Sequence, residues 1–399
     1  MKYNFDQIID RRASDSVKWT AYDPDVIPLW IADMDFPSPE PVVRALTARA
    51  QHGVYGYPDS IYDTSGQLTK LRQIIVEHLA QRYQWQVNPE DIVFAPSVVV
   101  GFHLACLALA QPHEAVLVQT PVYPPILVAA HETGIQGQTT KLSRNTDGSY
   151  SVDWDALEAS ITPETRLFIL CNPHNPVGKV FQPDELARLA EICLRHRVTI
   201  VADEVHCDLI YPEGHHTPIA AMDAEVAQNT ITLMSPSKTY NLAGLQCSFA
   251  IIPNRELRKR YTFAGRALIP WVNIFGLLAA QVAYQEGEEW LQELLLYLKA
   301  NRDYLLDFAH QHLPGVHIGR PQGTYLAWLD CRKANLPTTP YRFFLEKARV
   351  ALNDGDKFGP GGEGFVRLNF ACPRPLLQQA LERMSEALQN HLKPCADDQ

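Results

Sequence analysis

A lysine lies in a short polar motif between two apolar segments of this 399-residue chain. Lys238 belongs to the sequence Ser-Pro-Ser-Lys-Thr-Tyr-Asn, and the flanking segments, Thr230–Met234 and Cys247–Ile252, have the composition of short buried strands. Enclosure between buried strands takes an ammonium group out of water and favours the neutral, nucleophilic amine. Such an amine can condense with an aldehyde. Because a lone lysine is more often a solvated loop residue, this hypothesis depends on the residues that accompany it.

Five further residues follow apolar segments in the same way. A carboxylate at Asp203 is costly to bury without a cation, and a protonated pyridine nitrogen is such a cation. Asn175 lies between prolines and offers an amide that can donate to a phenolate-like oxygen. Val98 and Val99 begin a helix whose free N–H groups suit a phosphate, and Tyr123 is placed to stack on a flat ring. Each signal is weak alone, but together, in this order, they indicate one cofactor site.

The elements that must position these residues alternate along the chain. Strands are expected at Ile92–Ala95, Ala115–Gln119, Arg166–Cys171, Val198–Ala202, Thr230–Met234 and Ser248–Ile252. Helices are expected between them at Val98–Ala110, Ile126–Glu132, Asp155–Ser160 and Pro183–His196. This alternation predicts an α/β fold, a mostly parallel sheet covered by helices on both faces. Ligands bind such sheets at the carboxyl ends of the strands, where the candidate residues lie.

The chain is long enough for two domains with a substantial core. We expect a large cofactor-binding domain at residues 45–285 and a smaller α+β domain made of residues 1–44, an extended arm, and residues 286–399. A long helix at Glu286–His312 should cross from one domain to the other. Beyond it, the pattern predicts strands at Thr324–Leu329 and Phe365–Phe370 and a closing helix at Pro375–Leu392.

Composition excludes several classes of function. A net charge of −10 argues against binding nucleic acid or an anionic membrane. No signal peptide follows Met1 and no apolar run is long enough to span a membrane. The eight cysteines contain no CxxC pair and no metal-like grouping. We therefore expect a cytoplasmic protein with reduced, mostly buried thiols and no metal.

Three motifs of other enzyme classes fail when their context is considered. The glycine-rich sequence at residues 359–364 precedes a strand instead of linking a strand to a helix, so it is not a dinucleotide-binding turn. Ser235 and Lys238 match the S-x-x-K of serine acyl-transfer enzymes, but the partner motifs S-D-N and K-T-G are missing. Asp203-Glu204 ends a strand as in nucleotidases, but the chain has no phosphate-binding G-x-x-x-x-G-K-[ST] loop.

The remaining pattern resembles the fold-type I pyridoxal-phosphate enzymes, the aspartate aminotransferase superfamily, over essentially the whole chain. The matching motifs follow one another in the family's order: the Pro-Ser-Val-Val turn at residues 96–99, Tyr123, Asn-Pro-His-Asn-Pro-Val-Gly, Asp-Glu and Ser-Pro-Ser-Lys. The resemblance implies pyridoxal 5′-phosphate (PLP) as cofactor, a catalytic role for Lys238, Asp203 and Tyr123, and a role for each site residue. In this assignment Lys238 binds the cofactor aldehyde, Asp203 pairs with its ring nitrogen, Asn175 contacts its ring oxygen, Tyr123 stacks on the ring, Val98, Val99 and Ser235 hold its phosphate, and Arg367 clamps the substrate carboxylate beside Asn175.

Within the superfamily, several motifs of this sequence are similar to those of the C–S lyase branch, which includes bacterial cystathionine β-lyases. These motifs include Ala-Asp-Met-Asp-Phe at residues 32–36 and Asp-Glu-Val-His at residues 203–206. Tyr57 matches a tyrosine that reaches the phosphate in the neighbouring subunit, which implies a homodimer with shared active sites. His206 and Gln246 stand where many aminotransferases have a tyrosine and a phosphate-binding arginine, and His206 is given no role.

The resemblance therefore predicts a β-elimination that cleaves cystathionine or a related cysteine S-conjugate to a thiol, pyruvate and ammonia. Transfer of the amino group to a 2-oxo acid is the alternative, because the sequence does not show substrate fit or water access. Some relatives also regulate transcription through a partner protein. Since this chain has no DNA-binding element, such a role would have to act through protein–protein contact.

Overall fold

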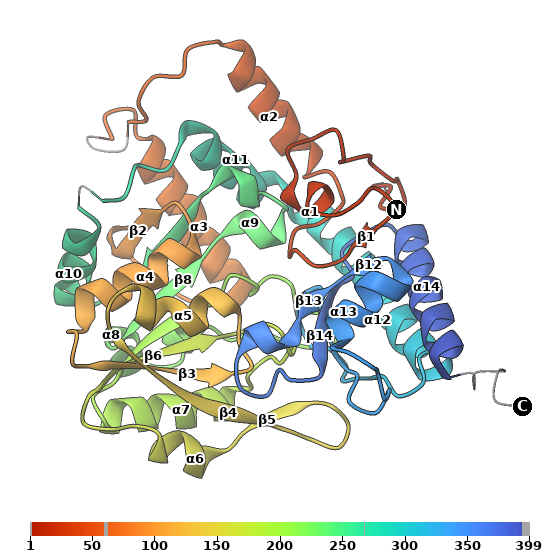
Figure 1. The fold of residues 1–399 in the computed structure, drawn as a ribbon. Coiled ribbons are helices and arrows are strands. Elements are labelled where there is room, and N and C mark those ends of the chain that lie inside the picture. The colour runs from red at the N-terminus through yellow and green to blue at the C-terminus, as the bar shows by residue number, and fades with distance from the viewer. Residues whose placement is uncertain (1, 60–62, 267, 393–399) are drawn as a thin grey trace, which may run out of the picture.

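Eight strands form the central sheet of the computed structural model, which describes residues 2–59, 63–266 and 268–392. Their order in the sheet is β2-β9-β8-β7-β6-β3-β4-β5, and only β9 and β5 run against the other six (Figure 1). The strands are β2 (Ile92–Ala95), β3 (Ala115–Thr120), β4 (Gln136–Arg144), β5 (Tyr150–Val152), β6 (Thr165–Cys171), β7 (Thr199–Asp203), β8 (Thr230–Met234) and β9 (Ser248–Ile251). The prediction of a mostly parallel sheet is confirmed.

Helices cover both faces of this sheet, because successive side chains of a strand point to opposite faces. In β6, Leu167 and Ile169 pack in one apolar cluster, and Phe168 and Leu170 pack in another. The first cluster includes side chains of α4 (Val98–Leu109), α5 (Pro124–Glu132) and α10 (Arg255–Gly265). The second includes side chains of α6 (Trp154–Ala159), α7 (Pro183–Arg195) and α8 (Ala224–Gln228).

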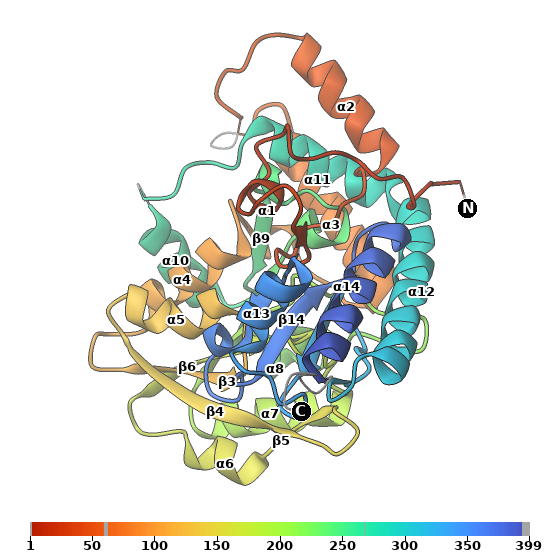
Figure 2. The same cartoon turned by 45° about the vertical axis from the view of Figure 1, so that its right-hand side comes forward.

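A second, antiparallel sheet lies on the C-terminal side of the molecule (Figure 2). Its order is β10-β11-β14-β13, with β10 (His317–Ile318), β11 (Leu326–Asp330), β14 (Phe365–Asn369) and β13 (Asn353–Asp354). Around it lie α12 (Glu288–His312), α13 (Pro340–Phe343) and α14 (Arg374–Leu392).

The N-terminal residues pack against this C-terminal part. The short helix α1 (Val17–Thr20) precedes β1 (Ile27–Pro28), which pairs in parallel with β12 (Val350–Ala351). Phe5, Leu29 and Phe36 share one apolar core with side chains of α12 and α14. The division into two domains at residues 45 and 286 stays a prediction.

Several elements differ from the expected ones. The strands β4 and β5 and the helices α10 and α11 (Ile274–Glu286) were not expected. The expected helix at Glu286–His312 begins instead at Glu288, because Gly287 separates it from α11. A Cβ at Gly287 would lie 2.4 Å from the Ala283 carbonyl oxygen and 2.6 Å from the Tyr240 ring, so only glycine allows this close passage.

Two further helices contact α11. The helix α3 (Gln67–Tyr83) packs against α11, whereas α2 (Glu40–Gln51) contacts α11 and projects from the body in both views (Figures 1 and 2). None of the helices in the described parts of the chain is long and apolar enough to cross a membrane. The seven described cysteines are buried and free, as expected, and Cys395 lies outside the described residues.

Candidate active site

A pocket opens where the carboxyl ends of β2, β3, β6, β7 and β8 lie near one another. Seven of the predicted site residues line it: Val98, Val99, Tyr123, Asn175, Asp203, Ser235 and Lys238. They come from strand ends, turns and helix starts at five strands, so the sheet brings together residues up to 140 positions apart. Their individual roles stay predictions, whereas their juxtaposition is a property of the fold.

Lys238 lies in the single helical turn α9 (Pro236–Thr239), and part of its side chain faces the pocket cavity. Its Nζ donates a hydrogen bond to the Ala32 carbonyl oxygen at 2.7 Å. Burial lowers the pKa of this amine to about 8, and the Arg367 guanidinium acts in the same direction, opposed by Asp33 and Asp203. About one amine in ten is therefore neutral and nucleophilic at pH 7, far more than for an ordinary lysine.

Asp203 ends β7 and is one of three buried carboxylates in six residues. Glu204 accepts a hydrogen bond from the His216 Nε2 at 2.9 Å, and Asp208 lies 2.8 Å from the Arg82 Nε. Asp203 accepts only from the Val205 N–H at 3.2 Å, and no cationic side chain of the described residues lies within salt-bridge distance of it.

Burial raises the pKa of Asp203 to about 7, because the Val205 N–H and the more distant Lys238 amine compensate its charge only in part. The other two carboxylates on this turn already have partners. Asp203 is thus buried without a salt-bridge partner among the described residues, and its pairing with a cationic ring nitrogen stays a prediction.

Arg367 is 3% exposed and lies on β14, between β11 and β13, so it is not a surface residue on an edge strand. Its Nη1 donates to Asn175 Oδ1 at 3.0 Å, and its Nη2 donates to the Trp30 carbonyl oxygen at 2.8 Å and to Asn353. None of these acceptors carries a charge, and burial lowers the pKa of Arg367 to about 10. A buried guanidinium without a carboxylate partner suits a substrate carboxylate.

The same contact orients Asn175. Because its Oδ1 accepts from Arg367, its Nδ2 is left to donate toward the pocket. Its carbonyl oxygen also accepts from the backbone N–H of Tyr123 at 3.0 Å, which joins the loops after β6 and β3. The ring contact of Asn175 and the stacking of Tyr123 stay predictions.

The first turn of α4 forms another wall of the pocket. The first N–H groups of a helix have no partner within the helix. Ser97 Oγ accepts from the Val100 N–H at 3.2 Å, which leaves the N–H groups of Val98 and Val99 for an anion. The Ser235 hydroxyl also lines the pocket, but it donates to the Cys247 carbonyl oxygen at 2.7 Å.

Sequence reasoning gave no role to His206 and Ala32, which also line the pocket. His206 is 3% exposed, its ring packs edge-on against Tyr325 at 5.8 Å, and its Nδ1 has no hydrogen-bond partner among the described residues. Burial holds the pKa of His206 well below its ordinary value, so the imidazole is neutral. Ala32 could not be found by sequence, because only its backbone contacts Lys238.

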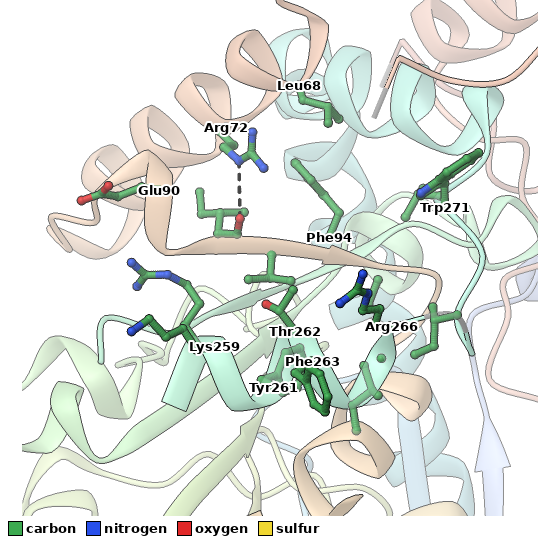
Figure 3. Close-up of a pocket in the computed structure, with 18 of the residues that line it drawn as sticks. Leu68, Arg72, Glu90, Phe94, Lys259, Tyr261, Thr262, Phe263, Arg266 and Trp271 are labelled. Atoms are coloured by element: carbon green, nitrogen blue, oxygen red, sulfur yellow. Dashed lines mark hydrogen bonds between the residues drawn. The ribbon is translucent and has the colours of Figure 1, made fainter. Parts of the chain in front are cut away.

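Tyr57 lies outside this pocket. Its side chain is 90% exposed, and its ring meets that of Trp271 edge-on at 5.7 Å. Trp271 belongs to the rim of a separate, larger cavity of about 930 Å³ that runs along edge strand β2 between α3 and α10 (Figure 3). Arg72 and Arg266 also line this cavity, which contains none of the predicted site residues.

Comparison with known proteins places this geometry in a family. The family described as "Aminotransferase class I and II" matches residues 24–384. The chain belongs to this family. It is 39% identical over 395 residues to "Cystathionine beta-lyase PatB" of Bacillus subtilis (strain 168), across 96% of this chain and 100% of that protein.

Two solved structures are similar over nearly their full length. The PLP-bound C–S lyase from Staphylococcus hominis has a TM-score of 0.91 at 32% identity, covering 98% of this chain and 100% of that one. The PLP-bound putative aminotransferase from Clostridium difficile 630 has a TM-score of 0.92 at 35% identity, covering 97% and 100%. The chain is thus a PLP-dependent enzyme of the C–S lyase branch.

The residues present fit this cofactor. The buried Asp203 lacks the cation that a pyridinium nitrogen would supply. The first turn of α4 offers N–H groups for its phosphate, and the amine of Lys238 is poised to condense with its aldehyde.

Proposed function

We propose that this protein is a C–S β-lyase that cleaves cystathionine or a related cysteine S-conjugate to a thiol, pyruvate and ammonia. The observation that carries the proposal is the full-length similarity to the Bacillus subtilis cystathionine β-lyase at 39% identity. The site supports it, since an amine with a lowered pKa and a carboxylate without a salt-bridge partner line the pocket, and the buried Arg367 guanidinium lies directly behind the pocket residue Asn175.

In this proposal Arg367 binds the α-carboxylate of the substrate through its planar fork. The two neutral side chains that it contacts, Asn175 and Asn353, hold that fork in place. When bound, PLP withdraws electrons from the substrate Cα and so acidifies the α-proton. Asp203 holds a proton at the ring nitrogen, which maintains this withdrawal.

Lys238 acts as the general base. Its neutral amine takes the α-proton, the Cβ–S bond breaks, and the sulfur leaves with the bonding electrons and is released as the thiol after protonation. Water then adds to the remaining three-carbon fragment, which departs as pyruvate and ammonia. The Ala32 carbonyl oxygen, 2.7 Å from Nζ, holds the amine in the pocket while it is not bonded to another group.

Amino-group transfer is the second candidate, favoured by the similarity to the putative aminotransferase from Clostridium difficile. It would use the same lysine as the base, but no thiol would be expelled. The two reactions differ in their need for a second substrate, since only transfer requires a 2-oxo acid.

The test is to supply cystathionine alone to the purified protein and follow pyruvate. We expect steady pyruvate release without any 2-oxo acid, and none above background from the Lys238→Ala variant. If pyruvate forms no faster than in that control while amino groups pass readily to 2-oxoglutarate, the protein is an aminotransferase.

We also propose that the enzyme is a homodimer with shared active sites. An exposed apolar cluster supports this: Tyr57, Phe263, Leu268 and Trp271 are 90%, 72%, 73% and 49% exposed, and two of them line the cavity of Figure 3. Exposed aromatic groups of this extent are typical of protein interfaces.

Subunit exchange tests this arrangement. Mixing a Tyr57→Phe chain with a Lys238→Ala chain gives heterodimers with one site free of both changes. Activity should then exceed that of either parent, with each homodimer as its own control. A fully active monomer at low concentration would refute the shared site.

A further inference from the structure

The backbone at Trp30–Phe36, here called the arm segment, forms part of the wall around Lys238. Each of the five consecutive carbonyl oxygens from residue 30 to residue 34 accepts a hydrogen bond from a side chain distant in sequence. The donors, in the order of these carbonyls, are Arg367, Asn369, Lys238 together with Tyr325, Asn369, and Asn241.

Four charged side chains hold this segment from behind. This charge quartet consists of Arg11, Lys18, Asp33 and Asp35. Lys18 is fully buried and its Nζ lies 2.7 Å from Asp35 and 3.3 Å from Asp33. Arg11 lies 2.6 Å from Asp35 and 2.9 Å from Asp33. The quartet thus contains two positive and two negative charges and is internally neutral.

The buried ion pairs of the quartet lie next to the backbone that contacts Lys238. Burying an ion pair costs desolvation that its attraction often only balances. Asp33 and Asp35 belong to the arm segment, directly beyond Ala32, whose carbonyl oxygen holds the Lys238 amine at 2.7 Å. The charge on Asp33 also acts on that amine.

We propose that the charge quartet is a positioning network for the catalytic lysine. Its opposing charges fix the arm segment so that the Ala32 carbonyl oxygen holds the Lys238 amine. Its neutrality keeps the field of Asp33 from holding that amine protonated. The inference rests on the proposed role of Lys238 and gives functions to Lys18 and Arg11, which do not touch the pocket.

The charged groups around the Lys238 amine and around the quartet determine the direction in which each substitution should shift the pKa of Lys238. The Lys238 amine faces Arg367 on β14, Asp203 on β7, Asp33 on the arm segment and the neutral imidazole of His206. Beyond its own members, the quartet faces the Cys372 thiol and the indole N–H of Trp19, which donates to Asp35 at 2.8 Å. Removing the charge of Lys18 leaves Asp33 less compensated, so the pKa of Lys238 should rise. Removing that of Asp33 should lower it.

A double-mutant cycle tests this in cofactor-free protein. The variants are Lys18→Met, Asp33→Asn and the two combined. Competitive acetylation with acetic anhydride, followed by mass spectrometry of the Lys238 peptide, gives the midpoint of amine ionisation at each variant without any need for activity. The control is Arg349→Met, because Arg349 binds Asp23 and Asp25 of the N-terminal residues at 2.7 Å on the surface, away from the pocket.

We expect Lys18→Met to make the Lys238 amine about three- to tenfold harder to deprotonate and Asp33→Asn to make it easier by a similar factor. The ionisation constant of this amine in the double variant should lie within about twofold of the wild-type value. In the PLP-loaded enzyme, the pH profile of kcat should move in the same directions. The Arg349→Met control should move neither readout.

A merely structural quartet would give a different result. Lys18→Met would then lower thermal stability, and activity at every pH, while the midpoint of ionisation of the Lys238 amine would stay unchanged. If Lys18→Met does not fold, the Asp33→Asn variant decides alone: a midpoint within twofold of the wild type overturns the proposal. Failure of the proposed function is separate, since it would appear as absent pyruvate formation by the wild type while these midpoints still differ.

Discussion

Replacing Asp203 with asparagine should have opposite effects on the cofactor-free protein and on the loaded enzyme. The change keeps the size of the side chain and removes only its charge. In the cofactor-free fold, Asp203 is 4% exposed and has a pKa of about 7 instead of its ordinary 3.8. A raised pKa means that the folded state binds the proton more tightly than the unfolded state does.

The contribution of Asp203 to the free energy of unfolding follows from that difference. Well below pH 3.8 the carboxyl is protonated in both the folded and the unfolded state, so it costs no stability. The cost grows as the pH rises to 7, because the unfolded state then loses the proton before the folded state does. At pH 8 the difference corresponds to about 4 kcal/mol. For a chain of this length that is a shift of about 5 °C in Tm. The cofactor-free Asp203→Asn variant should therefore melt about 5 °C higher than wild type at pH 8 and equally at pH 4.

In the loaded enzyme, the asparagine cannot hold the ring nitrogen protonated. Losing one member of a buried charge pair costs about 3–5 kcal/mol, which is at least 10²-fold in rate. The matched control is Asp208→Asn on the same turn. Because Asp208 already contacts Arg82 and Tyr83, that change should lower the Tm of cofactor-free protein.

Thermal melts at pH 4 and 8 and steady-state kinetics provide the measurements. The reasoning is refuted if cofactor-free Asp203→Asn melts below the wild type at pH 8, or if its loaded form loses tenfold in rate or less, which is about 1.4 kcal/mol.

Three further predictions concern the same pocket. Arg367→Lys keeps the charge but loses the planar fork, so kcat/KM should fall about 10- to 100-fold with a higher KM; an unchanged KM would contradict the carboxylate role. If the Lys238 amine is the base, as proposed, kcat should rise with pH and level off above the lowered pKa of that amine, which is about 8 in the cofactor-free protein; a profile flat from pH 6 to 9 would exclude it. Ser97→Ala removes the cap of α4 and should cost about 1 kcal/mol in unfolding experiments, with weaker PLP binding measured by dialysis; Ser160→Ala, at the far end of α6, should leave PLP binding unchanged.

The candidate site was predictable because each of its parts follows a strand with a local signature. Asp203, Asn175 and Lys238 each lie at or after the end of a short, mostly apolar segment, and such segments predict buried parallel strands. Their ends must meet at one edge of the sheet. No long-range information was needed to place them together.

Other features depend on contacts that a single sequence does not reveal. The strand β4 is mostly exposed and polar, so no apolar run marks it, and its pairing with β3 determines it instead. Arg367 and Asn175 are 192 residues apart and meet only through the packing of the two sheets. The charge quartet was missed for the same reason, because Lys18 on its own resembles any surface lysine.

The central claim is that Lys238 carries the cofactor, and borohydride reduction followed by peptide mapping tests it most directly. Purified protein should be yellow, and reduction should attach a pyridoxyl group to the single peptide that contains Lys238. The Lys238→Ala variant should take up no such label. Reduction that labels a different lysine, or a colourless protein that cannot be reconstituted with PLP, would contradict the account.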